Sequence, residues 1–187
     1  MDYERATLSE MRSEILSSDY KGMPTAGLIF WSIWAVILFI FPKPQAINYL
    51  AWSCGLIFPL GVLITRLRGH DMFKEAKDNP LSSVFMLGLV TCLLFFPLVM
   101  IAASIDPLLF VVGLSLIAGN IWIIWGWTAD TNLGLHHAIG RAIGCYLAYL
   151  FVPDPYTAAT ICTVVVLAYL YSFWRMRSLP TPDAAPE

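Results

Sequence analysis

An arginine inside an apolar segment is the residue of this sequence with the clearest capacity for chemistry. Arg141 lies in a long hydrophobic run, with His136 and His137 shortly before it. Burying a charge in hydrocarbon is costly, so an ionisable residue at such a place is a candidate for function. A guanidinium carries a permanent charge and five N–H donors, which suit a carboxylate or a phosphate. The residue types therefore indicate anion chemistry.

Polar residues recur around Arg141 at helical spacing. A stripe with a period of four residues runs along one face of its segment, through His137, Arg141, Cys145 and Tyr149. We therefore expect Arg141 to face the interior of a helix bundle. By rise per residue, Arg141 lies roughly 12 Å from the cytoplasmic end of its helix, and Asn120 on the preceding helix roughly 10 Å from the same side. Tyr169 on the following helix is close in depth, so the candidate ligand-binding residues are Arg141, His137, Asn120 and Tyr169.

Three environments for Arg141 remain open. No Asp or Glu lies in an apolar segment at its depth. Arg141 could extend to cytoplasmic water and phosphates. It could instead bond to Asn120, to tyrosine hydroxyls, or to the Gly55 carbonyl that Pro59 leaves without its helical partner. In the third case it binds a small anion or a lipid phosphate in a cavity that opens to the cytoplasm.

Other chemistry has little support in the sequence. Adjacent histidines on a helix point about 100° apart, so His136 and His137 do not suit one metal ion or a haem. The four cysteines lie in apolar runs with no CxxC pair. Paired carboxylates, an HExxH motif and a nucleophile within reach of a base are missing. We expect no metal and no cofactor, and an enzyme is the least favoured class.

Composition determines the class of protein. Of the 187 residues, 58% are hydrophobic and 13% charged, whereas a soluble domain has about 25% charged residues. The net charge of -2 gives no basic field for nucleic acid. We predict an all-α, polytopic membrane helix bundle with a short amphipathic N-terminal helix, whose main partner is the lipid bilayer.

Six apolar segments are each near the roughly 20 residues that cross a hydrocarbon core. Prolines and charged residues separate them, since consecutive prolines cannot continue a helix. The predicted transmembrane domain covers residues 23–175. Its spans are 25–42, 46–66, 81–104, 108–127, 133–152 and 156–174.

The two ends of the chain are polar. Residues 1–22 contain a capping-box pattern, Thr7 to Glu10, and apolar residues at helical spacing, which predicts an amphipathic helix on the membrane surface or against the bundle. Residues 176–187 include three prolines, so we expect a disordered cytoplasmic tail.

Basic residues predict the orientation. With six spans, nine of them lie on one side and Lys43 alone on the other. Because basic loops stay in the cytoplasm, both termini and the loop at 66–80 are expected there. The nine are Arg5, Arg12, Lys21, Arg66, Arg68, Lys74, Lys77, Arg175 and Arg177.

Tryptophans and small residues favour packing roles. The tryptophans of the fourth and sixth spans lie near the cytoplasmic ends, as an interfacial belt would, whereas Trp31, Trp34 and Trp52 lie deeper and could line a cavity. Gly140 and Gly144 form a row with Ala148 on the fifth span, which favours close helix contact and offers a face for a homo-oligomer.

Several short motifs resemble those of an uncharacterised family of small bacterial multi-pass inner-membrane proteins, a domain of unknown function. The motifs are Met11-Arg12-Ser13-Glu14-Ile15, Lys21-Gly22-Met23-Pro24, Cys54 with Pro59-Leu60, and Asn79-Pro80-Leu81. The resemblance implies a location in the bacterial inner membrane and transfers no activity and no site residues.

Two functional hypotheses follow. The favoured one is transport of a small solute or anion, or binding of an anion or lipid, through the polar residues around Arg141. The alternative is a non-catalytic accessory or regulatory membrane subunit, which fits the short loops and the scarcity of charge inside the spans.

Overall fold

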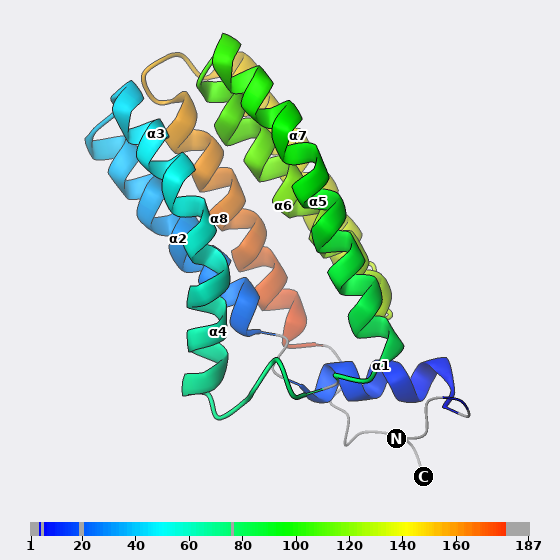
Figure 1. Cartoon of the computed structure of the whole chain (residues 1–187). Coiled ribbons are helices and arrows are strands. Elements are labelled where there is room, and N and C mark those ends of the chain that lie inside the picture. The colour runs from blue at the N-terminus through cyan, green and yellow to red at the C-terminus, as the bar shows by residue number, and fades with distance from the viewer. Residues whose placement is uncertain (1–3, 5, 19–20, 76, 179–187) are drawn as a thin grey trace.

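The structure is a bundle of long helices with one short helix lying across its end (Figure 1). It is a computed structural model and describes residues 4, 6–18, 21–75 and 77–178. Within these residues the helices are α1 (Leu8–Ser17), α2 (Gly22–Ile40), α3 (Pro44–Ser53), the 3₁₀ turn η1 (Cys54–Leu56), α4 (Ile57–Leu67), α5 (Pro80–Ile105), α6 (Leu108–Thr128), α7 (Leu133–Phe151) and α8 (Thr157–Met176).

The predicted helical membrane bundle is confirmed. Among the described residues, five segments are long and apolar enough to cross a membrane: α2, α3 to α4 as one unit, α5, α6 and α8. The sixth predicted span, α7, has 19 residues and packs against α6 and α8. Its two histidines and Arg141 lower its hydropathy, so α7 is not one of these five segments.

Prolines and caps set the helix limits. Pro44 and Pro80 begin α3 and α5 at the first helical position, where a missing N–H is harmless. Pro59 lies in the first turn of α4, directly after the 3₁₀ turn. Because Pro59 cannot donate to the carbonyl four residues earlier, the second span is divided into α3, η1 and α4.

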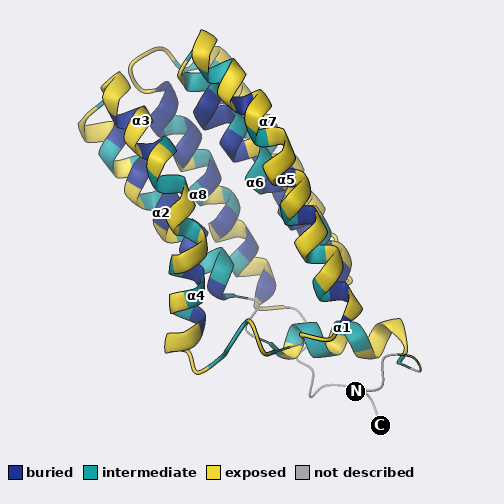
Figure 2. Cartoon of the chain, viewed as in Figure 1, coloured by how far each residue is buried: buried dark blue, intermediate teal, exposed yellow. Residues whose placement is uncertain are grey.

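Four helices form the interior. α8 packs against α2, α6 and α7, and α6 packs also against α5. In the most apolar stretch of α6 and of α8, 44% of residues are buried, against 17% in α5 and in the Pro44–Leu67 segment. Figure 2 shows the same contrast, with exposed residues along α5 and buried ones between the central helices. The site must therefore lie among α2, α6, α7 and α8.

The amphipathic helix α1 is attached to the bundle end. Its predicted capping box is present, since the Glu10 amide donates to Thr7 Oγ1 (3.3 Å) and the Thr7 amide to Glu10 Oε2 (2.7 Å). Asn79 caps α5 by accepting from the Leu81 amide (3.0 Å) and donates to the Met11 carbonyl (2.9 Å) and Glu14 Oε2 (2.7 Å). The helix α1 therefore lies against the bundle, which is one of the two predicted placements; the other was on the membrane surface.

A second contact fixes the other side of α1. Arg12 donates to the carbonyl of Trp127 in the last turn of α6 (3.0 Å) and forms an ion pair with Asp130 in the turn that follows (2.8 Å). The helix predicted over residues 1–22 is thus limited to Leu8–Ser17 within the described residues, and Gly22 already begins α2. The predicted tail covers residues 176–187. Its first residue, Met176, is the last residue of α8, and residues 177 and 178 follow the helix. Residues 179–187 lie outside the described residues.

Candidate functional site

A tight hairpin between α6 and α7 places the first residues of the site. A Cβ on Gly134 would overlap the backbone carbonyl of Trp122, and a Cβ on Gly126 would lie 2.9 Å from the Gly134 Cα. The Thr131 amide donates to the Gly126 carbonyl (2.8 Å), and Asp130 has a φ of 53° in the turn. Two glycines therefore bring the backbones of α6 and α7 into contact at the level of Trp122.

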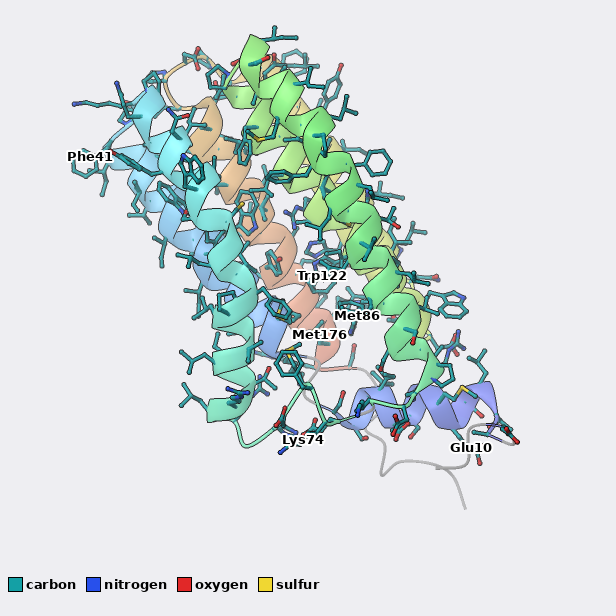
Figure 3. The ribbon with its side chains drawn as sticks, viewed as in Figure 1. Glu10, Phe41, Lys74, Met86, Trp122 and Met176 are labelled. Atoms are coloured by element: carbon teal, nitrogen blue, oxygen red, sulfur yellow. The ribbon has the colours of Figure 1, made fainter. Side chains whose placement is uncertain are left out.

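Three rings meet just inside this hairpin. The indole of Trp122 stacks on the imidazole of His137, with ring centroids 4.0 Å apart and 11° between the planes. Tyr169 of α8 meets both rings edge-on, at 5.6 Å from Trp122 and 5.2 Å from His137. His137 Nδ1 and Ser172 Oγ are hydrogen-bonded at 2.7 Å. These contacts join α6, α7 and α8, and Figure 3 shows Trp122 inside the bundle.

Arg141 lies one helical turn further along α7 and is completely buried, with 0% of its surface exposed. Its guanidinium carbon is 5.3 Å from the ring centre of Trp31 on α2 and 5.7 Å from that of Tyr169. Gly119 of α6 faces its aliphatic stem, since a Cβ there would be in ordinary van der Waals contact with Arg141 Cδ, at 3.5 Å. The charge is thus enclosed by aromatic faces, an arrangement that attracts cations.

The hydrogen-bond donors of this group are unused. Among the described residues, no acceptor bonds to Nε, Nη1 or Nη2 of Arg141. The same holds for Nε2 of His137 and for the indole N–H of Trp31. Buried polar groups are normally paired, and each exception in a folded protein needs an explanation. Five such atoms gather around Arg141, although others, such as Arg12 Nε and Thr65 Oγ1, lie elsewhere among the described residues.

A groove between α7 and α8 leads to the cluster. Its volume is about 330 Å³, at the lower end of the roughly 300–1,000 Å³ of ligand pockets. Four residues come from each helix: His136, His137, Gly140 and Arg141 from α7, and Val164, Leu167, Ala168 and Tyr171 from α8. Tyr171 Oη lies 3.4 Å from His136 Nδ1 across the part of the groove nearest the start of α7. Two of the predicted site residues therefore line a groove in the described part of the bundle.

Of the four predicted site residues, the structure brings three together. Arg141 faces the interior, and His137 and Tyr169 surround it. Asn120 has to be removed from the predicted set, because this residue is exposed on the outer side of α6. Its depth matches that of Arg141, but its direction does not: Gly119, one residue earlier, faces Arg141.

Two of the three predicted environments of Arg141 are also corrected. Full burial excludes extension to cytoplasmic water. The unused nitrogens exclude bonding to carbonyls or hydroxyls of the described chain, and the space beside Gly55 is empty of Arg141. Tyr149, at the far end of the predicted stripe, instead donates to Asp106 Oδ2 (3.2 Å) near the opposite bundle end. The third predicted environment, with a bound anion or lipid phosphate, stays a prediction.

Sequence reasoning missed several members of the cluster. Trp122 and Trp125 are buried rather than part of an interfacial belt, whereas Trp52, predicted to be deep, is 88% exposed. No sequence pattern singles out Ser172, although it lies i+3 from Tyr169 on the same helix. The glycines at 119, 126 and 134 are a usable signal, since small residues mark close contacts between membrane helices.

The small-residue row on α7 packs within the chain. A Cβ on Gly144 would meet Val164 of α8 at 2.7 Å, and Ala148 is buried. Gly140 alone has free space around it and faces the groove. The row is therefore used for contact between α7 and α8, and the homo-oligomer through this helix stays a prediction. In the part of the chain that the structure describes, no three His, Cys, Asp or Glu side chains are grouped to hold a metal ion.

Comparison with known proteins gives a family. Residues 8–178 match a family of unknown function, DUF7010. The match covers nearly the whole chain from α1 to the end of α8, so the protein belongs to this family. Neither the curated proteins nor the solved structures contain a match to the chain.

Proposed function

We propose that this protein binds a small anionic ligand at Arg141, inside the helix bundle and within the membrane. The observation that carries the proposal is a fully buried guanidinium whose three nitrogens all lack an acceptor among the described residues. A carboxylate or phosphate would satisfy several of these donors at once, because both oxyanions match the planar fork of arginine.

The energetics support a ligand over a structural role. A buried charge without a partner costs several kcal/mol even after relaxation. Stacking on Trp31 and Tyr169 offsets about 2 kcal/mol for a desolvated cation. The remainder is the kind of penalty that proteins accept at binding sites, where stability is exchanged for function. Transport of the ligand would be an extension of this binding.

The proposal includes a location in the bacterial inner membrane with the termini in the cytoplasm. α1, the connection from α4 to α5 and the end of α8 all lie at one end of the bundle (Figure 1). This end holds Arg12, Lys74 and Arg175, whereas Phe41 lies at the other end (Figure 3). By the positive-inside rule, the first end faces the cytoplasm.

Labelling tests the orientation. An impermeant thiol reagent on intact cells should leave Lys74→Cys unmodified and should label Gln45→Cys, on the opposite side. The reverse result would place the basic end outside and contradict the proposed topology.

Thermal unfolding of the purified, delipidated protein tests the binding. The probes are acetate, inorganic phosphate and dodecanoate, the last below the concentration at which it forms micelles. A ligand that binds only the folded state raises the unfolding temperature. At least one of these probes should do so, and Arg141→Gln should remove the effect.

Two further variants sharpen the result. Arg141→Lys keeps the charge but not the planar fork, so it should weaken the stabilisation by the anion without a large loss of folding. Arg175→Gln removes an exposed arginine from the end of α8 and should leave the stabilisation unchanged. If no probe stabilises the wild type, or if Arg141→Gln responds like the wild type, anion binding at this site is wrong. The protein would then be better described as an accessory subunit.

A further inference from the structure

The groove opens on the side wall of the bundle, not at its end. It lies between neighbouring helices that both carry exposed apolar residues, Ile139 and Ile143 on α7 and Leu167 and Leu170 on α8. Such a side of a transmembrane bundle faces hydrocarbon. A ligand that enters here comes from the lipid, not from the cytoplasmic solution.

The groove runs from the cytoplasmic side toward the middle of the membrane. His136 and Tyr171 lie near its cytoplasmic part, where they contact each other at 3.4 Å. Val164 lies twelve residues before Met176 at the end of α8, roughly 18 Å into the bundle at the rise of an α-helix. Since the hydrocarbon core is about 30 Å thick, the groove covers most of the inner leaflet.

The groove is lined by polar residues and by small or apolar residues. Apart from the two histidines, the tyrosine and Arg141, its lining is Gly140, Val164, Leu167 and Ala168. Gly140 has nothing within 4 Å of where its Cβ would be, so the groove wall is open at this position. An apolar groove with one buried cation directly behind its wall complements a molecule with one charged end and one apolar chain.

We infer that the ligand of the Arg141 site is a single-chain anionic amphiphile, of the class of a fatty carboxylate or a monoalkyl phosphate, taken from the inner leaflet through the α7–α8 groove. This inference rests on the proposed anion binding and adds its substrate class and its route. On binding, side chains of the groove wall move aside so that the oxyanion contacts the guanidinium, which is completely buried in this structure. The chain lies along Gly140, Val164 and Leu167 and continues into the lipid.

The size of the groove favours one chain over two. At about 330 Å³ it is at the lower end of the range for pockets that hold small ligands. Its walls are two helices that touch again at Gly144 and Val164, which limits its width. A two-chain phospholipid would have to leave one chain outside, so a single chain uses the available apolar surface fully.

Chain length and charge can be varied separately in the probe. Dodecanoate, acetate and dodecanol differ in one feature at a time. The purified full-length protein should be half-saturated by dodecanoate at a concentration at least tenfold lower than by acetate, as measured by the shift in unfolding temperature. Dodecanol should stabilise it less than dodecanoate at every concentration.

Filling the groove should weaken binding of the chain more than binding of the charged end. Gly140→Leu and Ala168→Leu each add a large side chain to the groove wall and keep Arg141. Each should weaken dodecanoate binding at least tenfold and acetate binding by a clearly smaller factor. Ile139→Leu, on the exposed side of α7 next to the groove, is the matched control and should change neither. The two groove variants lie on different helices. If one of them fails to fold, dodecanoate binding can still be measured in the other.

The outcomes separate the inference from the function on which it rests. If acetate and dodecanoate bind equally, both dependent on Arg141, the anion site stands and the amphiphile is wrong. The amphiphile is equally wrong if the groove variants bind dodecanoate like the wild type. If dodecanol is as effective as dodecanoate, recognition of the charged end is wrong. If no probe depends on Arg141, both proposals fail.

Discussion

The indole of Trp122 and the imidazole of His137 lie face to face, 4.0 Å apart, across the contact between α6 and α7. The stack joins the helix that ends in the tight hairpin to the helix that carries Arg141. It also holds His137 against Ser172 of α8 at 2.7 Å. The geometry of the buried cluster therefore depends on the backbone contact that lies beside it, at Gly134.

Gly134→Ala tests this dependence. The new Cβ would overlap the Trp122 carbonyl, a backbone atom that cannot move aside. We expect a loss of at least about 3 kcal/mol, the upper end of overpacking effects in cores, in thermal or denaturant unfolding in detergent. Gly140→Ala is the matched control on the same helix, where the Cβ meets nothing within 4 Å. Because alanine is the better helix former, that variant should be neutral or stabilised by up to about 1 kcal/mol. Equal losses in the two variants would contradict the described hairpin.

Asn79 is predicted to hold α1 to the bundle. Asn79→Ala removes the cap of α5, with a typical cost of about 1 kcal/mol, together with both bonds to α1. Asn79→Asp keeps an acceptor for the Leu81 amide but places a carboxylate against the Met11 carbonyl and Glu14. Both variants should increase hydrogen exchange in α1, and only the alanine should destabilise the bundle substantially. Unchanged exchange in the aspartate variant would show that α1 is held by other contacts.

The capping box predicts how α1 responds to acid. The Thr7 amide and then the Thr7 hydroxyl donate to Glu10, and these bonds hold the pKa of its carboxyl below the ordinary value of 4.5. A depressed folded-state pKa stabilises the helix above the unfolded pKa, and this contribution is lost as the pH falls through the folded value. Exchange in α1, corrected for intrinsic rates, should therefore rise as the pH is lowered below 4.5. Glu10→Gln should remove this rise in exchange at low pH. If the variant shows the same pH profile as the wild type, the rise is caused by another group.

Much of the fold is predictable because its signals are local. Pro44, Pro80 and the charged stretch after Arg66 end or begin helices by chemistry that acts within a few residues. The inward direction of Arg141 follows from a polar stripe with helical spacing. The 3₁₀ turn at Cys54–Leu56 is less accessible, since a proline predicts a disturbance and not its form.

The composition of the site is harder to predict, because it depends on which way each helix is rotated. Depth alone pairs Asn120 with Arg141, but a helix turns about 100° per residue, and Gly119 faces the cation instead. The position of Trp122 along its helix fits an interfacial belt as well as it fits the buried cluster. A groove formed by Gly140 and Ala168 requires the α7–α8 contact, which no local pattern contains.

The stability of Arg141→Met tests the central claim most directly. Methionine is flexible and unbranched, replaces the aliphatic stem of the arginine, and carries no charge beside Trp31 and Tyr169. If the buried guanidinium lacks protein partners, the delipidated variant should be more stable than the wild type, by about 1–4 kcal/mol, and should gain nothing from dodecanoate. If Arg141 is instead paired within the protein, its replacement should cost about 3–5 kcal/mol. A variant destabilised to that extent would contradict the assignment of Arg141 as a ligand-binding residue.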